Sequence, residues 1–108
     1  MTAIVTVYAT FPAGEEAARI ARILVEERLA ACANILGACQ SIYRWQGAVE
    51  EAAEVAVLFK TRAARAEALI ARLAELHSYD VPAAVVWPIA DALGAYAGWV
   101  ESESAKVV

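Results

Sequence analysis

The spacing of apolar residues along the chain predicts four β-strands. Four segments are rich in β-branched and aromatic residues and are bounded by turn formers: residues 4–8, 33–45, 48–60 and 84–87. The second and third of these segments are separated only by Gln46-Gly47, which predicts a tight turn and therefore a hairpin. Pro88 stops the last segment, because proline cannot donate to a strand ladder.

Apolar residues at helical spacing predict three helices, over residues 15–31, 62–77 and 93–103. In the first helix Ala17, Ile20, Ala21 and Leu24 form one stripe, and in the second the stripe is Ala66, Leu69, Ile70, Leu73 and Leu76. Thr61 precedes the second helix and is predicted to cap it. The third helix is short and carries Tyr96 and Trp99.

The order of these elements is β-α-β-β-α-β followed by a helix, which indicates an α+β, ferredoxin-like sandwich. In that arrangement the first and third strands are central and the other two lie at the edges. The alternation of the second strand slips at Gly37, which predicts a β-bulge, and Pro88 ends the fourth strand. Both ladder breakers thus fall in the expected edge strands, while residues 55–59 are apolar on both faces, as a central strand requires.

The predicted hairpin is longer than its own protomer can cover. Arms of 12 residues or more span about 40 Å at ~3.3 Å per residue, whereas a helix of ~16 residues spans only ~24 Å. Tyr43 and Trp45 lie in the part that overhangs. Exposed aromatic residues on an edge strand favour pairing with another chain, so we expect a homo-oligomer joined through sheet edges.

Composition supports one globular domain covering residues 1–108. Hydrophobic residues make up 61% of the chain, and 27 of the 108 residues are alanine. No apolar run approaches the ~18 residues of a membrane span. The first ten residues carry no basic side chain, which argues against a secretory signal, so we expect a cytoplasmic location and no membrane partner.

Charge and motifs exclude several functions. Nine basic and 13 acidic residues give a net charge of −4, which argues against a nucleic-acid partner. Cys32 and Cys39 lack the spacing of zinc or redox motifs. The chain has no phosphate-binding glycine loop and no nucleophile elbow. A general base would have to be His77, Lys60 or a carboxylate, and we expect no enzyme activity.

Several motifs resemble those of the CutA family, the divalent-cation-tolerance proteins. They are Glu27-Arg28-Leu29-Ala30-Ala31-Cys32, Asn34-Ile35, Ser41-Ile42-Tyr43-Arg44-Trp45, Gly47, Glu50, Glu54, Lys60-Thr61, His77-Ser78-Tyr79-Asp80-Val81-Pro82, Pro88-Ile89 and Tyr96-Ala97-Gly98-Trp99. The resemblance implies a homotrimer whose long hairpins pair between subunits, and an association with copper or other divalent metal ions. It thus implies a function in tolerance of divalent cations.

The resemblance also indicates candidate metal ligands. Some members carry a cysteine and a second histidine where this chain has Ala9 and Leu76. Cys32 and His77 are the motif-matched ligands that remain, and a thiolate with an imidazole suits copper or zinc. For both residues a structural role is an open alternative: a buried, inert thiol for Cys32, and a helix C-terminal cap for His77. Cys39 matches no motif.

A second hypothesis is a trimeric small-molecule sensor with a ligand cleft between subunits. The candidate cleft residues are Tyr43, Trp45, Glu54, Lys60, Tyr79 and Trp99, and Glu50 and Asp80 are further sources of polar groups. Aromatic walls with a few convergent polar groups are typical of a ligand site. Burial of the same aromatic residues at a subunit interface is the alternative.

Overall fold

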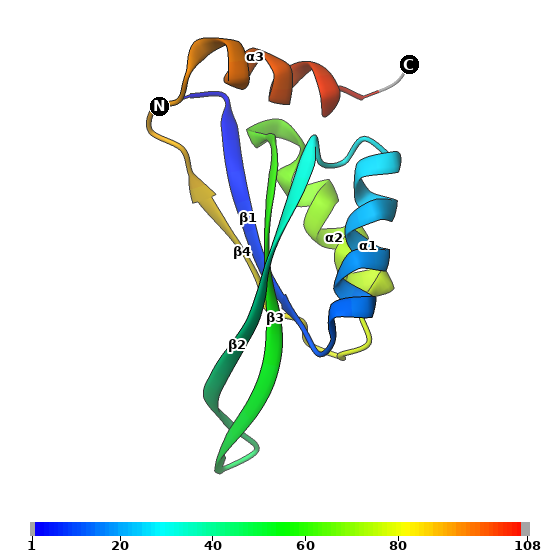
Figure 1. Ribbon diagram of the computed structural model, residues 1–108, viewed down its shortest axis with the longest axis vertical. Coiled ribbons are helices and arrows are strands. Elements are labelled where there is room, and N and C mark those ends of the chain that lie inside the picture. The colour runs from blue at the N-terminus through cyan, green and yellow to red at the C-terminus, as the bar shows by residue number, and fades with distance from the viewer. Residues whose placement is uncertain (1, 107–108) are drawn as a thin grey trace.

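The computed structural model describes residues 2–106, which form one four-stranded sheet, three α-helices and a short 3₁₀ helix (Figure 1). The elements run β1 (Ile4–Phe11), α1 (Gly14–Glu26), β2 (Cys32–Trp45), β3 (Ala48–Arg62), η1 (Ala63–Arg65), α2 (Ala66–Leu76), β4 (Ala84–Pro88) and α3 (Gly94–Glu103). Among the described helices, none has the length and apolar character needed to cross a membrane.

The sheet has the strand order β2-β3-β1-β4, and every pairing within it is antiparallel. β1 and β3 are therefore central and β2 and β4 are edges, which confirms the predicted ferredoxin-like arrangement. The bulge is also confirmed: the register shifts between Ile35 and Gly37, and Gly37 has φ +99°. The hairpin turn has Gln46 at φ +48° and Gly47 at φ +83°, as a type I′ turn requires.

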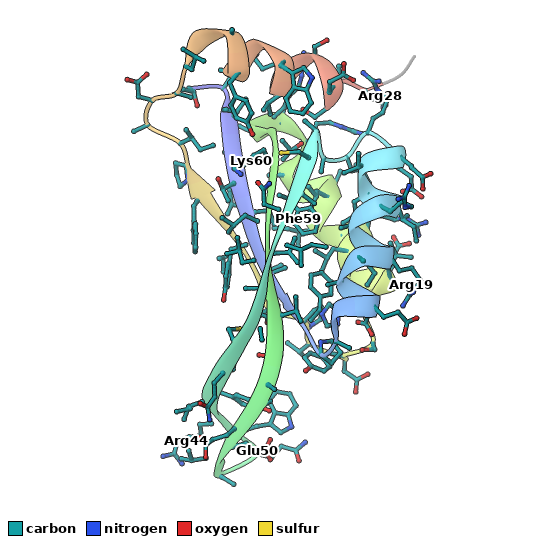
Figure 2. All side chains as sticks on the ribbon, in the orientation of Figure 1. Arg19, Arg28, Arg44, Glu50, Phe59 and Lys60 are labelled. Atoms are coloured by element: carbon teal, nitrogen blue, oxygen red, sulfur yellow. The ribbon has the colours of Figure 1, made fainter. Side chains whose placement is uncertain are left out.

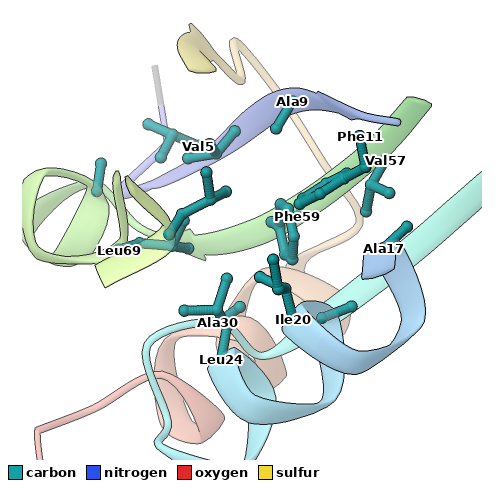
Figure 3. Packing of buried hydrophobic residues seen from close by; sticks show 14 residues of the cluster. Val5, Ala9, Phe11, Ala17, Ile20, Leu24, Ala30, Val57, Phe59 and Leu69 are labelled. Carbon is teal, nitrogen blue, oxygen red and sulfur yellow. The ribbon is translucent and has the colours of Figure 1, made fainter. Parts of the chain in front are cut away.

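One face of the sheet holds the main core. Alternate residues of β1 point toward α1 and α2, and Val7, Ala9 and Phe11 are fully buried there (Figure 3). The predicted stripe of α1 packs against them, with Ile20 and Leu24 fully buried. Small alanine side chains in this layer let the helices approach the sheet closely. The apolar stripes of the helices and the inward-facing residues of the strands thus form a single core.

The opposite face of the sheet is covered only at one end, by α3. Ile4, Ala31 and Val100 form a second, smaller cluster beneath this helix. The guanidinium of Arg28 holds the end of α3, with Nη2 donating to the Ser102 carbonyl at 2.8 Å and Nε to the Ala105 carbonyl at 3.3 Å. A cation at a helix C-terminus is favourable because the carbonyl ends carry partial negative charge. The rest of this face has no helix over it (Figure 1).

The hairpin of β2 and β3 extends beyond the ends of α1 and α2 (Figure 1). Its strands contain 14 and 15 residues and pair from Cys32–Lys60 to Trp45–Ala48. Figure 2 shows Arg44 and Glu50 near its tip, far from the helices. The overhang predicted from strand length is therefore present.

The first helix ends earlier than predicted. Residues 27–31 are not helical, because Arg28 adopts φ +62° and closes α1 with two backbone bonds, Arg28 N–H to Val25 and Leu29 N–H to Leu24. These bonds are those of a Schellman motif, here built on arginine where glycine is usual. Side-chain anchoring on α3 offsets the cost of this conformation.

The predicted cap of the second helix is wrong. Thr61 lies in β3, paired with Val5, and its hydroxyl donates to the Leu29 carbonyl at 2.7 Å instead of capping a helix. The chain then passes through η1 before α2 begins at Ala66. A partly buried carbonyl in the loop after α1 needs a donor, and this need outweighs the local capping preference.

Candidate functional site

The uncovered part of the sheet is an aromatic and aliphatic surface, which we call the open face and define by Tyr8, Leu58, Val85 and Trp87. Tyr8 lies opposite Leu58 on one side and Val85 on the other. The rings of Tyr8 and Trp87 stack at 5.0 Å with an interplanar angle of 10°. Val85 and Trp87 are each 47% exposed, so this surface is apolar and open to contact.

Below the open face a hollow of about 510 Å³ lies between the hairpin and the loop that follows α2. Because paired residues of antiparallel strands share a face, the pairs Tyr43–Glu50 and Cys39–Glu54 place both glutamates on this side. We call this hollow the Glu54 cavity; its lining residues are Tyr8, Thr10, Ser41, Tyr43, Trp45, Glu50, Glu54, Tyr79, Asp80, Val81 and Ala83.

Glu54 and Tyr79 form the polar centre of the cavity. The Tyr79 hydroxyl donates to Glu54 Oε2 at 3.0 Å, and Glu54 is only 8% exposed. Burial raises the pKa of Tyr79 to about 12, with a further contribution from the bond to Glu54. The pKa of Tyr43 is also raised, first by desolvation and then by Glu50. Both phenols are therefore neutral at physiological pH.

His77 lies immediately behind this cavity and is bonded at both ring nitrogens. The Tyr79 backbone N–H donates to Nδ1 at 3.0 Å, so the proton of a neutral ring is on Nε2, which donates to the Thr10 carbonyl at 2.8 Å. The ring stacks on Phe11 at 4.9 Å, and its side chain has no exposed surface. His77 thus joins the end of α2 to β1 and positions Tyr79.

Cys32 lies at the other end of the sheet, close to α3. Its Sγ is 3.5 Å from the Tyr96 hydroxyl, and burial followed by this contact raises the pKa of Tyr96 to about 12. Lys60 pairs with Cys32 across the strands and donates from Nζ to Asn34 Oδ1 at 2.9 Å. Trp99 lies beside Tyr96 on α3, with ring centres 5.8 Å apart.

The structure therefore brings together four of the six predicted cleft residues, Tyr43, Trp45, Glu54 and Tyr79, with Glu50 and Asp80 beside them. Lys60 and Trp99 lie near Cys32 instead. Tyr8, Thr10 and Ser41 also line the cavity and were missed by the sequence. Two of them could have been found from the alternation of side chains along a strand, because Tyr8 and Thr10 lie on the face of β1 opposite to its buried valines.

Cys32 and His77 do not share a site within one protomer. Cys32 is paired with Lys60 and through it with Thr6, whereas His77 contacts Thr10. Four residues of strand separate these positions, or roughly 13 Å. Among residues 2–106, no group of three or more His, Cys, Asp or Glu side chains is placed to hold a metal ion.

Comparisons with known proteins connect this arrangement to one family. A family profile described as CutA1 divalent ion tolerance protein matches residues 5–103. The chain is 45% identical over 95 residues to the divalent-cation tolerance protein CutA of Thermus thermophilus, covering 88% of this chain and 92% of that one. It is 41% identical over 103 residues to the protein of the same name from Pyrococcus horikoshii, covering 95% and 100%.

Solved structures agree. The crystal structure of CutA from Xylella fastidiosa superposes with a TM-score of 0.93 at 38% identity, covering 96% of this chain and 100% of that one. The divalent cation tolerance protein from Thermus thermophilus superposes with a TM-score of 0.91 at 43% identity, covering 94% and 99%. The similarity therefore extends over the sheet, the hairpin and the helices together.

Proposed function

The chain belongs to the CutA1 divalent ion tolerance family, and from this premise we propose that it acts as a cytoplasmic homotrimer in the response to divalent metal ions. The observation that supports an oligomer is the apolar surface that one protomer leaves exposed. Val85 and Trp87 are each nearly half exposed, and β2 and β4 are the edge strands of the protomer's sheet. Such surfaces favour association between copies, because burial removes apolar area from water.

The proposed metal chemistry is weak binding of copper or another divalent ion, with Cys32 and His77 as candidate ligands. Cys32 is partly exposed, and among the described residues its sulfur has one hydrogen-bond partner, the neutral phenol of Tyr96. His77 would have to release the Thr10 carbonyl or the Tyr79 N–H before a ring nitrogen could coordinate an ion. The two side chains do not form a shared site in one protomer, so within a protomer each lacks the other as a second ligand, which is consistent with low affinity.

Light scattering and calorimetry test both parts of this proposal. We expect the mass of three chains at micromolar concentration, and a monomer would contradict the trimer. Titration with Cu²⁺ should show weak binding that Cys32→Ser reduces, whereas Cys39→Ser, a matched change in the same strand, leaves it intact. If neither Cys32→Ser nor His77→Ala changes the affinity for Cu²⁺, the assignment of these residues as ligands is wrong.

A second candidate function, small-molecule sensing, is favoured by the Glu54 cavity. Its volume of about 510 Å³ and its aromatic walls are those of ordinary ligand sites, which span ~300–1,000 Å³. Thermal-shift screening of the oligomer tests this, because a ligand that binds only the folded state raises the melting temperature by mass action. A screen of anionic, neutral and cationic metabolites without any shift would contradict a ligand role.

A further inference from the structure

The charged side chains that line the Glu54 cavity are all acidic. Three carboxylates line it, from Glu50, Glu54 and Asp80, and the described lining residues of the protomer include no lysine or arginine. We propose that the cavity binds a small organic ammonium ion, with the N–H groups on the carboxylate of Glu54 and the apolar part against the aromatic walls. This inference rests on the cavity being a ligand site, the second function proposed above.

Glu54 is the residue that points most directly to a cation. It is more than nine-tenths buried, yet within the protomer no lysine, arginine or histidine among residues 2–106 forms an ion pair with it. Oε2 accepts the Tyr79 hydroxyl, while Oε1 accepts no hydrogen bond from the described residues. Oε1 is not fully enclosed, and Glu54 lines the cavity, so Oε1 faces the cavity. A buried carboxylate without a counter-charge is costly, and an ammonium ion would supply both charge and donors.

The walls suit the rest of such a ligand. Tyr43, Trp45 and Tyr79 place three aromatic rings around the same hollow. Aromatic faces attract cations and pack against hydrocarbon. Tyr79 is held by its bond to Glu54 and by ring contact with His77 at 4.8 Å, so its position is set before any ligand enters.

Two other ligand classes fit less well. A metal ion needs several ligands within about 2.0–2.6 Å, and the described carboxylates are not grouped closely enough to hold one. An anion would meet three carboxylates with no basic partner in the lining. The nearest arginine of the hairpin, Arg44, pairs with Val49 on the opposite face, so it does not neutralise the cavity. Of the three ligand classes, an organic cation fits the cavity best, because it needs only one carboxylate and an apolar enclosure.

A matched pair of probes tests the charge selectivity on the unmodified protein. 2-Phenylethylamine and 2-phenylethanol have nearly the same shape and differ in charge. Calorimetric titration of the intact oligomer should give an affinity for the amine at least about tenfold above that for the alcohol, or ~1.4 kcal/mol. Equal affinities would overturn the ammonium proposal while leaving the cavity as a ligand site. Binding of neither compound at millimolar concentration would overturn both.

Variants locate the site. Glu54→Gln keeps the shape and the capacity to accept from Tyr79, and it should reduce amine affinity about tenfold while leaving alcohol binding unchanged. Glu51→Gln is the matched control, because it removes the same negative charge at a position on the opposite face of β3, beside Gln40. Loss of amine binding in Glu51→Gln to the same degree, or full binding in Glu54→Gln, would contradict the proposal. The probe comparison on the unmodified chain stands even if a variant does not fold.

Discussion

The hydroxyl of Tyr79 donates a hydrogen bond of 3.0 Å to the buried carboxylate of Glu54. This contact ties the loop after α2 to the long hairpin, across 25 residues of chain. Both residues line the cavity, and the contact occupies Oε2 while Oε1 of the carboxylate accepts no hydrogen bond from the described residues. The same contact therefore serves stability and, under the proposal above, ligand recognition.

Removing this hydroxyl should destabilise the protein. Tyr79→Phe leaves Glu54 without its donor, and bonds to charged groups contribute about 1.5–3 kcal/mol. Denaturant unfolding should show a loss in this range. Tyr8→Phe is the control, because Tyr8 lies on the same sheet face and its hydroxyl makes no hydrogen bond within the described residues. Equal losses in the two variants would show that the bond contributes little.

Stability should fall at alkaline pH. Burial raises the pKa of Tyr79 and of Tyr96 to about 12 in the folded chain, whereas an unfolded tyrosine titrates near 10. Between these values the folded state binds more protons than the unfolded state, so the free energy of unfolding decreases as pH rises from about 10 to about 12. Denaturant titrations across this range measure the slope. Tyr79→Phe should make it shallower, and an unchanged slope in both Tyr79→Phe and Tyr96→Phe would contradict the assignment.

His77 should contribute to stability independently of any metal. His77→Ala removes a fully buried ring, its bond to the Thr10 carbonyl and its acceptor for the Tyr79 N–H. We expect a loss of about 2–4 kcal/mol in metal-free buffer, measured by urea unfolding. Ser78→Ala, at the next and exposed position, should lose less than about 1 kcal/mol. A small loss in His77→Ala would contradict this structural role.

Two glycines should respond to alanine with opposite signs. Gly37 has φ +99° at the bulge of β2, a conformation that an L side chain rarely adopts, so Gly37→Ala should destabilise by about 1–3 kcal/mol. Gly98 lies within α3 and an added Cβ meets nothing within 4 Å, so Gly98→Ala should stabilise by about 0.5–1 kcal/mol. Thermal unfolding of both variants checks the signs, and matching signs would contradict one of the two conformations.

The order of elements and the identity of the edge strands could be predicted from the sequence because the signals are local. The β-forming residues of β1, the apolar run before Lys60 and the breakers Gly37 and Pro88 each report the environment of their own strand. The same reasoning identified an overhanging hairpin, since strand length and helix length follow from residue count. Four of the residues predicted for a cleft between subunits, Tyr43, Trp45, Glu54 and Tyr79, line one cavity of the protomer, and their role as a ligand site stays a prediction.

Only the tertiary structure decided how side chains are partnered, because partners come from distant segments. Nothing near Thr61 in sequence shows that its hydroxyl bonds to Leu29 instead of capping a helix. His77 lies 67 residues from its acceptor Thr10, and this bond holds its ring away from Cys32. Glu54 is buried without a basic partner because the hairpin and the loop of Tyr79 meet there. Periodicity therefore determined the layers of this protein, and long-range packing determined its site.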